Sequence, residues 1–173
     1  MLTGNPGHLK AFDYAGPYRY SLTFCTDCRQ RVFVTRERID LVLMQIERSA
    51  AEEQFAVIAY CFMPDHLHLL VEGRSEASDC RRFINRAKQF LGFHYAKAFG
   101  HRLWQRYGFE RVLRNDEATL VVARYILENP LRAGLVRRVE DYPFAGSRVC
   151  SLAEILEAVS IGNDGPAEAG HYA

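Results

Sequence analysis

The pattern of apolar and polar residues along the chain predicts four β-strands. Short runs in which apolar and polar residues alternate, rich in aromatic and β-branched side chains, are typical of strands. We expect strands at residues 18–25, 55–62 and 66–72, and a strand or a strand with a loop at 103–113. Only Met63, Pro64 and Asp65 separate the second strand from the third, so these two should be antiparallel neighbours.

Apolar residues spaced three and four apart predict helices between and after these strands. The expected helices run from Thr35 to about residue 51, from Ser75 or Ser78 to about residue 99, from Asn115 to about residue 130, and over 151–159. Polar side chains can cap their first turns. Gly100 should end the second helix and Pro130 the third, since proline cannot continue a helix.

The order β-α-β-β-α-β is typical of the ferredoxin-like, split βαβ arrangement, an α+β fold with an antiparallel sheet. Two helices should cover one face of the sheet and leave the other face open, and a further C-terminal helix carries Tyr125. We expect an irregular arm over residues 1–16 and one domain over 17–145. A short helix and a disordered tail should follow over 146–173.

The composition allows one domain, and the distribution of charge suggests a partner with a phosphate backbone. The chain has 173 residues, 49% of them hydrophobic, and a formal net charge of only +1. Positive charge is nevertheless concentrated over residues 81–138, which hold 13 Lys and Arg against four Asp and Glu. Such a basic segment is typical of a protein that binds a phosphate backbone, although a solvated arginine-rich surface explains the same excess.

His66 and His68 are the first candidates for chemistry. They lie two residues apart in an apolar strand, so both side chains should project from one face while Leu67 and Leu69 point to the other. Two imidazoles about 7 Å apart along a strand can bind one metal ion. The alternative is a pair of hydrogen-bonded core histidines.

Tyr125 and Asn129 are the second pair. Four residues apart in the third helix, they should lie on the same face, one turn apart. Asn129 offers a carbonyl oxygen that can bind a metal, and Tyr125 offers a phenol that becomes a nucleophile when deprotonated. Asn129 can equally be part of an Asn-Pro helix stop, and Tyr125 can be a core or interface aromatic residue.

Together these segments resemble the single-tyrosine transposases with a His-hydrophobic-His motif, and among them the REP-associated tyrosine transposases. The matching segments are residues 18–24, 62–71, 104–105, 111–115 and 125–136, within a similarity that covers about 8–145. The resemblance implies that His66, His68 and Asn129 hold a divalent metal and that Tyr125 attacks DNA. Related insertion-sequence enzymes usually have glutamine at the third ligand position, which is one methylene longer than Asn129.

The resemblance further implies Mg²⁺ or Mn²⁺ as cofactor, a 5′-phosphotyrosine intermediate, and single-stranded or hairpin DNA of the REP type as substrate. Five polar residues are candidates for contacts with the DNA backbone: Arg86, Lys88, Gln89, Arg114 and Arg124. Three aromatic residues, Phe93, Tyr95 and Trp104, either stack on bases or belong to the core.

Two other functions fit the same residues. A ferredoxin-like module could bind single-stranded nucleic acid without catalysis, and a metal-dependent hydrolase could cleave DNA without a covalent step. The odd number of cysteines and the lack of a long apolar segment indicate a cytoplasmic protein with no membrane partner. The resemblance leaves a monomer and a homodimer as alternatives. Cys25 and Cys28 have the spacing of a zinc knuckle, but no second pair follows, so free thiols are expected.

Overall fold

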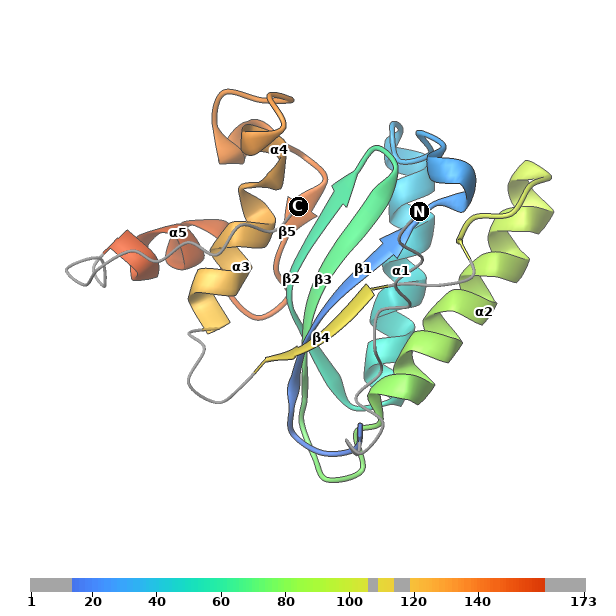
Figure 1. Ribbon diagram of the computed structural model, residues 1–173, viewed down its shortest axis with the longest axis horizontal. Helices are drawn as coiled ribbons and strands as arrows, with labels where there is room; N and C mark the ends of the chain where they lie inside the picture. Colours follow the sequence, from blue (N-terminus) through green and yellow to red (C-terminus); the bar gives the residue numbers. More distant parts are fainter. Residues whose placement is uncertain (1–13, 106–108, 114–118, 161–173) are drawn as a thin grey trace, which may run out of the picture.

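A five-stranded antiparallel sheet lies at the centre of the computed structural model, which describes residues 14–105, 109–113 and 119–160 (Figure 1). The strands are β1 (Arg19–Cys25), β2 (Phe55–Met63), β3 (His66–Gly73), β4 (Phe109–Leu113) and β5 (Ala145–Gly146). Their order across the sheet is β4-β1-β3-β2-β5, and every pairing is antiparallel. The four predicted strands are therefore confirmed, and only the two-residue β5 was not expected.

The central pairings fix where the two histidines lie. A turn at Pro64 and Asp65 joins β2 to β3, so that Met63 pairs with His66. On the other side of β3, His66 pairs with Cys25 and His68 with Thr23 of β1. The histidines thus lie at the end of the two central strands, next to the β2–β3 turn.

Two long helices cover one face of the sheet (Figure 1). They are α1 (Arg36–Glu52) and α2 (Cys80–Phe99). Thr35 precedes α1 as expected, but the cap of α2 is Asp79, whose side chain accepts a hydrogen bond from the Arg82 amide. Gly100 ends α2 in the left-handed conformation (φ 77°) that glycine adopts without strain.

The sheet contributes every second side chain of its central strands to the core beneath these helices. The shared core includes Leu22, Phe24, Leu67, Leu69 and Val71 from β1 and β3, with Ile46 of α1 and Phe83 of α2. Leu67 and Leu69 therefore point away from the face that carries His66 and His68, as the alternation predicts.

The second face of the sheet is covered as well, so the expectation that it stays open was wrong. The helices α3 (Thr119–Leu127), α4 (Asn129–Arg132) and α5 (Leu152–Ser160) lie on that side (Figure 1). A second core joins Ile58, Cys61 and Leu70 of the sheet to Ala123 and Ile126 of α3. The reason is that β2 is apolar at almost every position and buried along its whole length, so both of its faces need a partner.

The chain ends contribute little to the described structure. Most of the predicted arm over 1–16 and the tail beyond residue 160 lie outside the described residues, as do Asn115 and Arg114. Within the described part of the chain, no helix combines the length and apolarity required to cross a membrane.

Candidate active site

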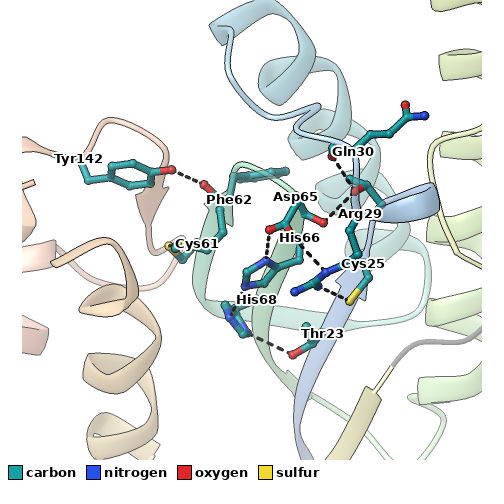
Figure 2. Close-up of polar contacts among 12 residues, drawn as sticks. Thr23, Cys25, Arg29, Gln30, Cys61, Phe62, Asp65, His66, His68 and Tyr142 are labelled. Carbon is teal, nitrogen blue, oxygen red and sulfur yellow. Dashed lines mark hydrogen bonds and ion pairs between the residues drawn. The ribbon is translucent and has the colours of Figure 1, made fainter. Parts of the chain in front are cut away.

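His66 and His68 converge on one point above the second face of the sheet (Figure 2). Their Nε2 atoms are 3.0 Å apart, and the rings meet edge to face with centroids separated by 4.7 Å. Two nitrogen ligands 90° apart, each about 2.1 Å from an octahedral ion, would lie about 3.0 Å from one another. The separation of the two Nε2 atoms therefore fits a shared divalent cation.

Each histidine is held through its other ring nitrogen. Asp65 Oδ1 lies 2.6 Å from His66 Nδ1, and Thr23 Oγ1 lies 3.1 Å from His68 Nδ1 (Figure 2). Because a carboxylate only accepts hydrogen bonds, Asp65 requires the proton of neutral His66 to be on Nδ1. The Nε2 lone pair of His66 then points toward the shared site, which is the arrangement common in metal-binding histidines.

A second contact immobilises Asp65 itself. Arg29 follows β1 in a short 3₁₀ turn, η1 (Asp27–Arg29), and its Nε lies 3.1 Å from Asp65 Oδ2. The same guanidinium donates from Nη1 to Cys25 Sγ at 2.9 Å. Thr26 also donates from its amide and its hydroxyl to the Asp65 carbonyl. The β2–β3 turn is therefore fixed to the end of β1, and the Asp65 carboxylate is aimed at His66.

Burial keeps His68 uncharged. Burial is the largest cause that lowers the pKa of His68 to about 3; His66, Arg132 and Arg29 contribute in the same direction, and Asp65 opposes them. At neutral pH the His68 imidazole is therefore in the form that can bind a metal.

Tyr125 lies on α3, on the side of the sheet that carries the histidines. Its side chain is 47% exposed, so the phenol is accessible to a macromolecular substrate. The guanidinium of Arg132 lies 3.8 Å from the centre of the Tyr125 ring, and Arg132 Nη2 donates to the Tyr125 carbonyl. The charge of Arg132 is also one of the causes that lower the pKa of His68.

Arg132 was missed in the sequence because the predicted helix ends at Pro130, so helical spacing does not relate Arg132 to Tyr125. The short helix α4 (Asn129–Arg132) brings Arg132 back to the Tyr125 ring. The Arg132 side chain also contacts Glu128 at 3.4 Å, and Glu128 in turn pairs with Arg124 at 2.7 Å. The predicted DNA-contacting residue Arg124 is thus engaged in an intrahelical ion pair.

Asn129 has a fixed amide orientation. Its Nδ2 donates to the carbonyls of Tyr125 and Ile126 at 3.2 and 3.1 Å. Since carbonyls only accept, the nitrogen must face the helix and the oxygen must face away from it. No group of three His, Cys, Asp or Glu side chains suited to a metal occurs among the described residues.

The other predicted DNA-contacting residues lie in different surroundings. Arg86 pairs with Glu52 and Glu53 of α1, so carboxylates already neutralise its charge. Lys88 and Gln89 line a hollow at the surface of α2. Arg114 is outside the described residues.

The three aromatic candidates divide between core and surface. Tyr95 and Trp104 are 0% and 4% exposed and belong to the core beneath the helices, whereas Phe93 is 68% exposed. The core alternative is therefore confirmed for Tyr95 and Trp104 only. All five cysteines are free thiols, as expected.

A family model described as "Transposase IS200 like" matches residues 16–129, well over half of the chain. A Haemophilus influenzae protein provisionally named a REP-associated tyrosine transposase is 25% identical over 155 residues, covering 79% of this chain and 83% of that protein.

Two further similarities agree with this match. The REP-associated tyrosine transposase of Escherichia coli K12 is 31% identical over 97 residues, which covers 54% of this chain and 55% of that protein. A solved structure of a REP-associated tyrosine transposase bound to a REP hairpin superposes with a TM-score of 0.67 and 18% identity. That superposition covers 96% of this chain and 94% of the other, and it shows a shared fold.

Proposed function

Because this chain belongs to the IS200-like transposase family, whose members are DNA-cleaving enzymes, we propose that it cleaves and rejoins single-stranded DNA with Tyr125 as the nucleophile. The observation that carries the proposal is the convergence of the His66 and His68 Nε2 atoms at 3.0 Å, on the side of the sheet where α3 presents an exposed tyrosine. Their Nδ1 atoms face Asp65 and Thr23, so the two Nε2 atoms face each other and a cation would replace the contact between them.

His66, His68 and the Asn129 side-chain oxygen would hold a divalent cation, Mg²⁺ or Mn²⁺. Neutral imidazoles combined with an amide oxygen suit these ions, and the protein ligands leave positions open for phosphate and water. When bound, the ion withdraws charge from a non-bridging phosphate oxygen and so makes the phosphorus easier to attack.

The covalent step exchanges one phosphate ester for another. A bond forms between Tyr125 Oη and the phosphorus, the bond from phosphorus to the 3′ oxygen breaks, and the departing strand takes up a proton as a 3′-hydroxyl. The phenol proton passes to water or a base. Arg132, stacked on the ring, holds the phenol in place and puts a positive charge near the developing negative charge. Because the phosphotyrosine conserves the ester bond, rejoining needs no ATP.

A REP-type hairpin with single-stranded flanks is the substrate we propose. A similar fold has been solved with a REP hairpin, and an unpaired strand can bring a phosphate to the exposed Tyr125 side chain more readily than a stacked duplex can. Lys88, Gln89, Arg114 and Arg124 would contact the DNA backbone. We propose that the protein acts in the cytoplasm, as a monomer or a homodimer in which each chain holds a complete site.

The test is covalent trapping. Wild-type protein incubated with Mn²⁺ and a hairpin carrying unpaired flanks should give a protein–DNA adduct on a denaturing gel, and Tyr125→Phe should give none. Tyr18→Phe is the matched control, because Tyr18 is 38% exposed and precedes the opposite end of β1. An adduct with Tyr125→Phe, or none with wild type, would contradict the proposal. Cleavage by Tyr125→Phe without an adduct would indicate a hydrolase. DNA binding that is unaffected by EDTA and by His66→Ala, and that is not accompanied by cleavage, would indicate a non-catalytic binding module.

A further inference from the structure

A hollow of about 330 Å³ opens between the middle of α2 and the segment that follows this helix. Six side chains define it: Lys88, Gln89 and Phe93 from α2, and Arg102, Trp104 and Gln105 from the segment. None of these lining residues is acidic. Its volume is at the lower end of the range for small-molecule sites, which suits one small group rather than a folded partner.

Phe93 is the most unusual lining residue. It is 68% exposed, and its one described ring contact is an edge-to-face contact with His94 at 5.5 Å. Beside it, Gly92 has no neighbour within 4 Å of the position that a Cβ would take, so the chain is open there. An exposed phenyl ring next to a hollow can gain stability by stacking on a flat group, and nucleobases are such groups.

Two cations line the same hollow as Phe93. Lys88 Nζ lies 3.5 Å from the Gln105 carbonyl and 5.3 Å from the centre of the buried Phe24 ring, so the ammonium connects α2 to the segment that follows it. Arg102 makes no ion pair with any residue in the described ranges. Arg86 provides the contrast, because two carboxylates of α1 neutralise it, as described above. The charge at the hollow therefore fits an anion such as phosphate.

The hollow is connected to the histidine pair through the sheet. Trp104 forms an isolated β-bridge with Thr26, and the Gln105 amide donates to the Cys25 carbonyl at 3.0 Å. Cys25 pairs with His66 on its other side. The backbones of Gln105 and His66 are thus two strand spacings apart, or about 10 Å. A short piece of single strand leaving the histidines can reach the hollow across the end of β1.

From these observations we infer that the hollow binds one unpaired nucleotide of the DNA substrate. This inference rests on the proposed function and adds a second contact site to it. The base stacks on Phe93, the phosphate lies against Lys88 and Arg102, and the neighbouring glutamine amides can bond to the base edge. Bases inside a duplex have their faces covered by neighbours, so only an unpaired nucleotide can occupy the site.

The experiment compares two hairpins in the Tyr125→Phe background, which is expected to bind DNA but not to cleave it. One hairpin has unpaired flanks and the other is blunt, and the affinity of the protein for each hairpin is measured in the presence of Mg²⁺. Phe93→Ala should weaken binding of the flanked hairpin about tenfold, as expected for loss of one stacked base, and leave the blunt hairpin unchanged. Phe93→Tyr should bind like the parent. Met44→Ala, which removes a 55% exposed apolar side chain from α1, is the matched control.

Trp104 offers an independent readout because it is the single tryptophan of the chain and it lines the hollow. Its fluorescence should change when the parent protein binds the flanked hairpin and should not change with the blunt one. The same response to both hairpins would contradict the inference.

The remaining outcomes separate the two proposals. If Phe93→Ala leaves both affinities unchanged or lowers both equally, the nucleotide site is wrong, while adduct formation through Tyr125 still supports the proposed function. If the folded parent binds neither hairpin, both proposals fail.

Discussion

At the scale of single residues, the site depends on how His66 is held. Sequence alternation places His66 and His68 on one face, and the structure confirms this. The sequence treats Asp65 only as part of a bend, because nothing in the order of residues shows that a carboxylate will meet the ring beside it. The contacts from Arg29 and Thr26 that aim Asp65 come from a segment about 40 positions away, so they arise only in the fold.

Asp65→Asn should lower Mn²⁺ affinity about tenfold without unfolding the protein. An amide removes the negative charge and can present its NH₂ group to His66, which would favour the tautomer whose Nε2 carries a proton and cannot bind a metal. The measurement is titration of unbound Mn²⁺ by electron paramagnetic resonance. Asp40→Asn, which alters an exposed carboxylate of α1, is the control. Equal Mn²⁺ affinities for Asp65→Asn and Asp40→Asn would show that Asp65 does not position the ligand.

At the scale of elements, the predicted third helix is two helices in the structure. The chain leaves α3 after Leu127 and begins α4 at Asn129, with Pro130 in its first turn. Proline has no N–H, so it cannot donate to the carbonyl of Ile126 four residues earlier. Asn129 Nδ2 makes that hydrogen bond instead, at 3.1 Å. The helix-stop interpretation of Asn-Pro is therefore confirmed, and the same hydrogen bonds aim the Asn129 oxygen outward.

Variants of Asn129 can separate these two roles. Asn129→Asp keeps an oxygen ligand but cannot donate to the two carbonyls, so we expect a loss of about 1 kcal/mol of stability with Mn²⁺ binding retained. Asn129→Ala should lose both the stability and part of the Mn²⁺ affinity. Chemical denaturation and Mn²⁺ titration measure the two effects on the same samples. Unchanged Mn²⁺ affinity in Asn129→Ala would remove Asn129 from the ligand set.

At the scale of the whole molecule, local patterns predicted the strands and the helices, whereas the packing of α3 and α5 on the second face of the sheet came only from the structure. The strands and the helices α1 and α2 follow from periodicity, which depends on neighbours in the sequence. The cover on the second face depends on α3 meeting β2 and on α5 packing against α3, which no local pattern encodes. One signal was present: Phe55–Met63 is apolar throughout instead of alternating, as expected for a strand buried on both faces.

The second layer also determines which chain completes the site. Ala123, Ile126 and Leu127 of α3 are buried against the same chain's sheet, so exchanging α3 with another copy would require this core to open and re-form. We expect each chain to use its own histidines and its own tyrosine.

A mixture of Tyr125→Phe with a His66→Ala/His68→Ala double variant should therefore form no adduct with hairpin DNA. The control is a mixture of wild type with either variant. Its adduct yield should equal the yield of the same amount of wild-type protein alone. Recovery of adduct in the mixture of the two inactive variants would mean that α3 of one chain serves the histidines of another, because only exchanged helices can bring an intact tyrosine to an intact histidine pair.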